Sequence, residues 1–255
     1  MFPYRDDNPS VLRPVVTIGL IAANLAMWVL VQGMGAGVAL AASVCELGLV
    51  PADLLGRAAA GTSFPIAEGL VCVVEPGTPW RTLVTSMFLH GGWLHLLGNC
   101  WFLWVFGNNV EDAMGHGRFA LFYVLCGLAA AAAQIVVDPS SLVPMVGASG
   151  AISGVMGAYA VQYPRVRIHS LVVLVVFFFR VSLPAWVMLG YWFALQLAGA
   201  GVEQVGGVAF WAHVGGFVAG VLLIIPFRDP ALLARRRDLL AARAWAAASA
   251  EGWPR

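Results

Sequence analysis

The chain has 255 residues, of which 60% are hydrophobic and only 11% are charged, and its mean hydropathy is +0.84. Soluble domains carry about a quarter charged residues, so this composition excludes an ordinary soluble domain and predicts a protein embedded largely in a membrane. The formal net charge of +1 comes with 14 basic residues, all arginine, and gives no indication of nucleic-acid binding.

Six apolar stretches are candidates for membrane-spanning helices, each of which needs ~20 largely apolar residues. In chain order they are 15–31, 93–106 with an expected upstream extension, 119–137, 148–161, 184–197 and 208–227. The fourth is short and rich in small residues. A further apolar stretch, 168–179, is bracketed by Arg167 and Arg180 and is too short to span. We predict an interfacial or re-entrant segment there, or an extension of the fifth helix.

The placement of arginine predicts the orientation, because basic residues collect in the cytoplasmic connections of membrane proteins. Arginines precede the first stretch, follow the second and the sixth, and lie between the fourth and fifth. The long connection 33–92 holds only Arg57 and Arg81, and the other alternate connections hold none. Six spans with both termini in the cytoplasm satisfy every connection.

This reading divides the chain into three parts. Residues 1–13 are a cytoplasmic segment, and residues 14–228 form the transmembrane domain, whose long outer loop is 33–92. Residues 229–255 alternate alanine and leucine with arginine, which is typical of a cytoplasmic amphipathic helix in contact with anionic lipid.

The four cysteines form no Cys-x-x-Cys pair, so neither a zinc cluster nor a redox motif is predicted, and no metal or cofactor is expected. Cys100 and Cys126 lie in apolar stretches and are expected to be packing residues. Cys45 and Cys72 share the outer loop, and they could form a disulfide if this loop lies outside the cell. The sequence leaves that pairing open.

Five polar residues lie in or beside the apolar stretches: His90, His95, Asn99, Ser149 and His213. Polar groups at membrane depth are costly and are usually functional. The second, fourth and sixth spans run from outside to inside, so these residues share one layer in the outer part of the bilayer. A hydroxyl, imidazoles and an amide are the groups that acyl transfer uses, although a lone serine or histidine in a membrane is more often structural.

Ser149 lies in Gly147-Ala148-Ser149-Gly150, at the expected start of the fourth span. Backbone N–H groups at a helix start are unpaired and can hold an oxyanion. Small residues spaced by three or four, at 150, 154 and 157 and at 212, 216 and 220, allow the fourth and sixth helices to approach closely. This packing would bring Ser149 to His213. No carboxylate lies in any expected span, so a Ser–His dyad is predicted instead of a triad, and an aspartyl protease is excluded.

Four motifs resemble those of the rhomboid intramembrane serine proteases. They are Trp80-Arg81, the run from His90 to Asn99 (HGGWLHLLGN), Gly147-Ala-Ser-Gly150, and the run 212–220 (AHVGGFVAG). Together they cover about residues 80–225 in the order and spacing of the family. The resemblance implies an all-α, six-transmembrane-helix bundle with a short central fourth helix. It also implies hydrolysis of peptide bonds in or near the transmembrane segments of single-pass or other membrane proteins, without a cofactor.

The resemblance also implies roles for individual residues. Ser149 is expected to be the nucleophile and His213 the general base, and the oxyanion hole is expected to comprise His95, Asn99 and the Ser149 backbone N–H. Structural roles are implied for His90, Trp80, Arg81, Gly147, Gly150, Gly216 and Glu111. The sequence departs from the family at Ser153, where many rhomboids carry an aromatic residue that stacks on the catalytic histidine. What orients His213 therefore stays open.

The implied location is the plasma membrane of a bacterium, with the site toward the outer face. The main alternative is a non-proteolytic rhomboid-like protein that binds transmembrane helices. Such proteins typically lack the nucleophile or the base, so the presence of Ser149 and His213 favours the protease. A small-solute transporter or channel is a weaker alternative, because proton-coupled transport usually needs a buried carboxylate.

Overall fold

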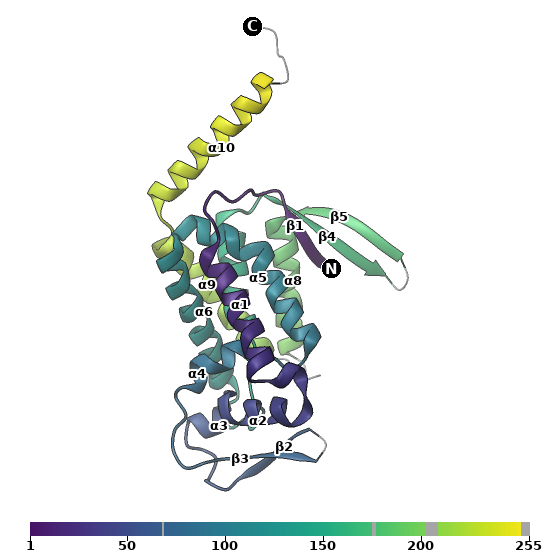
Figure 1. Ribbon diagram of the computed structural model, residues 1–255, viewed down its shortest axis with the longest axis vertical. Coiled ribbons are helices and arrows are strands. Elements are labelled where there is room, and N and C mark those ends of the chain that lie inside the picture. The colour runs from purple at the N-terminus through teal and green to yellow at the C-terminus, as the bar shows by residue number, and fades with distance from the viewer. Residues whose placement is uncertain (68, 175–176, 202–208, 251–255) are drawn as a thin grey trace.

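A computed structural model describes residues 1–67, 69–174, 177–201 and 209–250, and it is mainly helical (Figure 1). Six longer helices form a bundle: α1 (Val15–Leu30), α5 (Trp93–Met114), α6 (His116–Val137), α7 (Ser149–Gln162), α8 (Ala185–Ala200) and α9 (Phe210–Phe227). A seventh long helix, α10 (Pro230–Ala250), projects from one end of the bundle. Within the described ranges, α6 and α9 are long and apolar enough to cross a membrane, and α1 and α8 are apolar but shorter.

The helix positions agree with the apolar stretches of the sequence, with one difference in direction. The second helix was expected to extend upstream, but α5 begins at Trp93 and extends downstream to Met114. Gly92 has extended backbone that cannot continue a helix, which sets the start. The downstream extension carries Glu111 and Asp112, whose buried carboxylates accept hydrogen bonds from the backbone of the first 17 residues.

Of the alternatives for 168–179, the extension of the fifth helix is wrong, and the interfacial or re-entrant position stays a prediction. The fold is also not purely helical. This stretch forms the antiparallel hairpin of β4 (Arg167–Leu174) and β5 (Phe177–Pro184), and β1 (Phe2–Asp6) pairs with the free edge of β4. Consecutive β-branched and aromatic residues favour a strand over a helix. The hairpin leads directly into α8, whose position it therefore helps to set.

The long connection 33–92, which the sequence predicts to be an outer loop, is built from short elements that cover one end of the bundle (Figure 1). They are η1 (Gly33–Gly35), α2 (Gly37–Leu47), α3 (Pro51–Leu54), the hairpin of β2 (Ser63–Ala67) and β3 (Leu70–Val73), α4 (Thr82–Thr85) and η2 (Ser86–Phe88). A disulfide between Cys45 and Cys72 ties α2 to β3, with 5.4 Å between the two Cα atoms. The pairing that the sequence left open is therefore formed.

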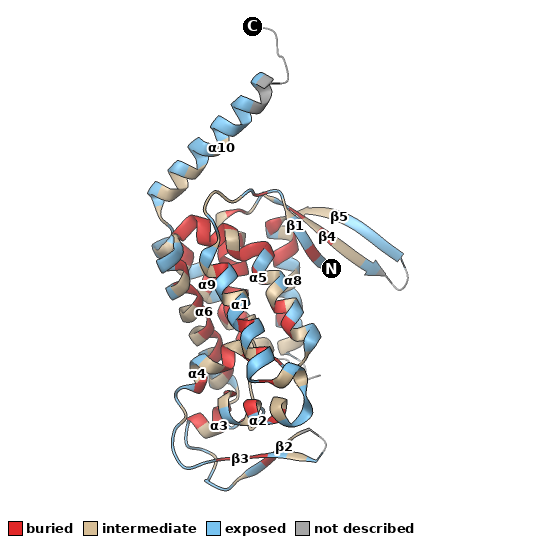
Figure 2. Ribbon diagram, viewed as in Figure 1, coloured by how far each residue is buried: buried red, intermediate tan, exposed pale blue. Residues whose placement is uncertain are grey.

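The central helix α7 is the most enclosed element of the bundle, and all ten residues from Gly150 to Tyr159 are buried. Figure 2 shows that buried residues gather inside the bundle, whereas α10 is mostly exposed. A Cβ atom at Gly216 or Gly220 of α9 would overlap the backbone of Gly150 or Gly154 of α7. The predicted contact through small residues is confirmed, and it sets the first turns of α7 and α9 against each other.

Candidate active site

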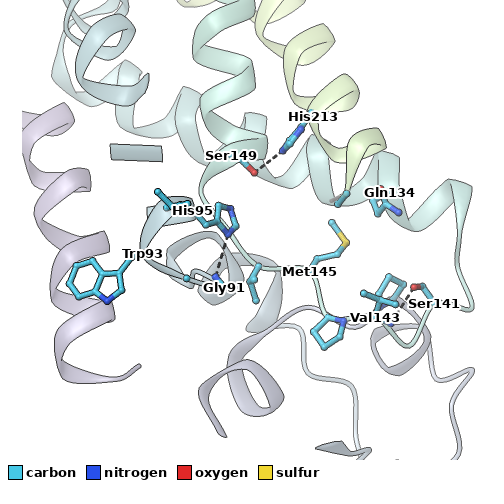
Figure 3. A pocket seen from close by; sticks show the side chains of 15 residues that line it. Gly91, Trp93, His95, Gln134, Ser141, Val143, Met145, Ser149 and His213 are labelled. Atoms are coloured by element: carbon cyan, nitrogen blue, oxygen red, sulfur yellow. Dashed lines mark hydrogen bonds between the residues drawn. The ribbon is translucent and has the colours of Figure 1, made fainter. Parts of the chain in front are cut away.

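Ser149 and His213 lie against each other where α7 and α9 begin (Figure 3). The Ser149 Oγ and the His213 Nε2 are 2.8 Å apart, which is hydrogen-bond distance. Ser149 is the first residue of α7, and no side chain caps that end of the helix. The backbone N–H groups of this turn therefore remain available to an anionic ligand beside the hydroxyl.

The backbone before Ser149 needs glycine. Gly147 has a φ of 126°, in the left-handed region that favours glycine. A Cβ atom there would lie 2.7 Å from the His95 Nε2 and 3.5 Å from the Ser149 Oγ. The bare face of Gly147 thus leaves a small space next to both polar atoms.

His95 and Asn99 supply hydrogen-bond donors from the first turns of α5. The backbone N–H of Gly91 donates to the Nδ1 of His95 at 3.3 Å, so the neutral ring carries its proton on Nε2, which faces Gly147. Asn99 is 6% exposed, and its Nδ2 has no hydrogen-bond partner within the described part of the chain. Leaving a buried donor unpaired costs ~1–3 kcal/mol, so this amide lowers the stability of the fold unless another group completes its hydrogen bond.

His213 is held from the side by α8. Its Nδ1 lies 2.8 Å from the Oε1 of Gln196, and the ring of Trp192 tilts over it at 39° with 5.9 Å between the centroids. The Ser153 hydroxyl donates a hydrogen bond to the Ser149 carbonyl at 2.6 Å. Ser153 is therefore not among the groups that hold the imidazole. The sequence alone did not identify Gln196 as a partner of His213. Its position, an amide in an otherwise apolar stretch four residues after Trp192, was the signal that pointed to it.

A cavity of about 820 Å³ lies between these groups and residues of the connections 33–92 and 138–148. Ser149, His213 and His95 line it together with residues of the connection between α6 and α7, among them Met145 (Figure 3). Asn99 is not among its lining residues. The cavity is large enough to take an extended piece of peptide next to the hydroxyl. Within the described residues, no cluster of three metal-ligating side chains occurs.

The residues expected to be structural lie around the cavity in different ways. His90 is fully buried, and its backbone exchanges two hydrogen bonds of 2.9 Å with the side chain of Gln32, which ties the outer loop to the end of α1. Trp80 and Arg81 lie on the surface before α4, where Arg81 pairs with Glu46 at 3.6 Å. They do not line the cavity.

The chain is similar to known proteins over the segment that carries this site. The family model described as "Rhomboid domain" matches residues 76–230. RHOMBOID-like protein 5 of Arabidopsis thaliana is 36% identical over 102 residues, 38% of this chain and 33% of that protein. Rhomboid protease GluP of Bacillus subtilis is 42% identical over 86 residues, 34% of this chain and 16% of that protein. Rhomboid protein 1, mitochondrial, of Saccharomyces cerevisiae is 29% identical over 168 residues, 64% of this chain and 46% of that protein.

These matches cover between 16% and 46% of the length of the three relatives. Two relatives from Bacillus subtilis carry the name of protease, GluP and the putative rhomboid protease YdcA. The family consists of membrane proteins and includes intramembrane serine proteases, although some of its members are inactive. Because the family model spans more than half of the sequence, the chain belongs to the rhomboid family.

Proposed function

We propose that the chain is an intramembrane serine endopeptidase that cleaves other membrane proteins in or near their transmembrane segments. The observation that carries this proposal is the 2.8 Å approach of the His213 Nε2 to the Ser149 Oγ at the wall of a cavity. A nucleophile and a base at this distance, with hydrogen-bond donors nearby, are the arrangement that acyl transfer requires.

In the proposed mechanism, the Ser149 Oγ attacks the substrate carbonyl carbon as the His213 Nε2 takes the hydroxyl proton. The carbonyl oxygen becomes an oxyanion, held by the His95 Nε2–H, the Asn99 Nδ2 and the Ser149 backbone N–H. His213 then gives its proton to the leaving amine, and the C–N bond breaks to leave an acyl-enzyme. Water, deprotonated by His213, attacks the acyl carbonyl, and Ser149 leaves with the returned proton.

We propose the six-span arrangement with both termini in the cytoplasm for this enzyme. The parts are residues 1–13 inside, 14–228 as the transmembrane catalytic domain, and 229–255 as the cytoplasmic tail. The Cys45–Cys72 disulfide supports an outer position for the loop 33–92, since disulfides persist in oxidising compartments. The cavity would then admit water from the outer face. A bacterial plasma membrane stays a prediction, because the relatives include mitochondrial and chloroplast proteins.

The decisive experiment compares the wild-type protein with Ser149→Ala and His213→Ala in liposomes that contain a transmembrane substrate. Each substitution is expected to lower cleavage by about 10⁴-fold or more, because the two groups act as one unit. The matched control is Ser43→Ala, since Ser43 bonds within α2 and does not line the cavity. It should retain wild-type cleavage.

A fluorophosphonate probe provides a second measurement that needs no substrate. It should label the wild-type protein and Ser43→Ala but not Ser149→Ala. A wild-type protein that captures transmembrane helices without cleaving them, and that the probe does not label, would instead support the non-proteolytic alternative.

A further inference from the structure

We propose that Gln196 is a positioning residue for His213, so that the catalytic unit is Ser149–His213–Gln196 with a neutral third member. This inference rests on the proposed function, because it assigns a task to Gln196 in the same proton transfer. Gln196 lies on α8 and is 9% exposed. It makes two hydrogen bonds, one through each end of its amide.

The two ends of the amide have fixed identities. The Nε2 donates to the backbone carbonyl of Trp192 at 3.2 Å, one turn earlier on α8. Only a donor can face that carbonyl, so the oxygen end of the amide must face His213. The Oε1 lies 2.8 Å from the His213 Nδ1 and can only accept a hydrogen bond.

This acceptor selects one tautomer of the neutral imidazole. The Nδ1 of His213 must carry the ring proton in order to donate to Gln196, which leaves a lone pair on Nε2. That lone pair faces the Ser149 hydroxyl at 2.8 Å and can take its proton. In the other tautomer, Nε2 would carry a hydrogen and could not act as the base. In a serine protease triad, loss of the correct tautomer lowers kcat by about 10⁴-fold.

The other neighbours of His213 orient the ring without selecting the tautomer. Trp192 and Phe210 present aromatic surfaces at centroid distances of 5.9 and 6.5 Å. His95, on α5, is a titratable group that lines the same cavity as His213. A neutral amide also suits an apolar bundle better than a carboxylate, because burying an ionised carboxylate without a matching partner is costly.

The test uses Gln196→Leu, Gln196→Glu and the control Gln162→Leu, all in the full chain in liposomes. Gln196→Leu is expected to lower kcat by roughly 10²-fold with KM within about twofold, because the tautomer is no longer selected but substrate contacts remain. Gln162 lies at the far end of α7 and does not line the cavity, so its variant should keep the wild-type kcat.

Gln196→Glu is expected to recover most of the lost rate, since a carboxylate also accepts from Nδ1. A carboxylate also stabilises the imidazolium, which cannot act as a base. The acidic limb of the profile of kcat/KM against pH should therefore move upward by about one pH unit or more. Destabilisation alone would not produce this rescue or this shift.

A spectroscopic measurement separates this inference from the proposed function. In protein labelled with ¹⁵N-histidine, the two ring nitrogens of His213 report the tautomer directly, and a His213→Ala sample assigns their signals among the five histidines. The wild-type protein should show Nδ1–H alone, and Gln196→Leu should show a mixture. An unchanged tautomer in Gln196→Leu would overturn the inference, whether or not the wild-type protein cleaves a substrate.

Discussion

Polar side chains at the two ends of α5 differ in whether their hydrogen bonds are completed within the chain. At its C-terminal end, the buried carboxylates of Glu111 and Asp112 accept several hydrogen bonds each. At its N-terminal end, Asn99 keeps a buried amide nitrogen without a partner in the described part of the chain, and the His95 Nε2–H faces a cavity. At the C-terminal end the Glu111 and Asp112 carboxylates are therefore satisfied, although the Asn109 Oδ1 has no partner in the described residues, whereas the N-terminal end carries unused donors.

The satisfied end ties together segments that are far apart in the sequence. Glu111 accepts from the backbone N–H groups of Val16 and Thr17 at 2.9 and 2.8 Å and from the Thr17 hydroxyl at 2.7 Å, so it caps the start of α1. Asp112 accepts from the backbone of Leu12 at 2.6 Å and from the Arg236 Nε at 3.0 Å. These bonds join the N-terminal segment, α1 and α10 to one point.

Under the proposed function, this difference separates residues that stabilise the fold from residues that bind the substrate. A polar group whose bonds are complete within the chain has nothing left to offer a substrate. A buried donor without a partner lowers stability and is retained where a ligand completes it. Substitutions at the two ends of α5 should therefore affect different quantities: the rate of cleavage at one end and the free energy of unfolding at the other.

The largest effects are expected at the end with unused donors. His95→Ala and Asn99→Ala should each lower kcat by about 10²–10³-fold with little change in KM, because these donors meet the oxygen only as it becomes negative. Rates of cleavage measured over a range of substrate concentrations check this. Thermal unfolding should be unchanged or slightly improved for Asn99→Ala, since an unpaired buried donor is removed.

Two further variants refine the role of the donors. Asn99→Asp has the same shape but carries no amide donor, so it should lose at least as much activity as Asn99→Ala. His95→Gln keeps a donor and should recover part of the rate. If Asn99→Asp cleaved like the wild-type protein, Asn99 would not hold an oxyanion.

At the satisfied end, Glu111→Ala should reduce stability while leaving the site intact. It removes the acceptor for two buried N–H groups at the start of α1, which costs about 3 kcal/mol in the free energy of unfolding. Denaturation of the protein in detergent micelles measures this loss. Cleavage per folded molecule should stay within about twofold of wild type, and Glu111→Gln, which keeps one acceptor, should lose less stability. A large fall in kcat for folded Glu111→Ala would contradict the separation of the two ends.

The sequence was sufficient to predict the helices and the meeting of Ser149 with His213. Both follow from strong local signals: long apolar stretches, and small residues at spacings that fit close helix contact. The β4–β5 hairpin was missed because hydrophobicity alone does not distinguish a short apolar helix from a strand. The β-branched and aromatic residues favour a strand, and pairing with Phe2–Asp6 completes the sheet.

The contact between His213 and Gln196 could not be derived from the sequence for another reason. It depends on the rotation of α8 about its own axis, which the packing of the whole bundle sets. The sequence reasoning considered only carboxylates as partners for the base, and Gln196 carries an amide. A structural role was expected for Glu111, but its network with Asp112 was not, since the expected end of the second span, residue 106, placed both outside the helix.

A smaller effect is expected from Arg236, which joins α10 to the satisfied end. Its side chain is 12% exposed and bonds Asp112 and the Asn8 Oδ1. Arg236→Gln should lower stability by about 2 kcal/mol, the range for hydrogen bonds to charged groups, and should increase hydrogen exchange of the α10 backbone. The neighbouring Arg237 is exposed and pairs only with Asp238, so Arg237→Gln should change neither quantity. Equal effects of the two substitutions would show that the charge of the tail, and not the contact of Arg236 with Asp112, determines stability and hydrogen exchange.

The smallest effect is expected from Asp6, whose carboxylate accepts from the Tyr159 hydroxyl and from the Asn109 amide. Burial raises the pKa of Asp6 above its ordinary value of 3.8, despite the hydrogen bond from Tyr159. The folded state therefore holds this proton more tightly than the unfolded state. The contribution of protonated Asp6 to the free energy of unfolding is fully present below about pH 3.8, and it is lost as the pH rises through the higher pKa of the folded state.

Asp6→Asn keeps an acceptor but cannot ionise, so it should escape that loss. Its melting temperature relative to wild type should rise between pH 4 and pH 7, by less than the change caused by Arg236→Gln. A difference that shrank as the pH rose would mean that the ionised carboxylate stabilises the fold, and Asp6 would then belong with Glu111 among the residues that hold this end together.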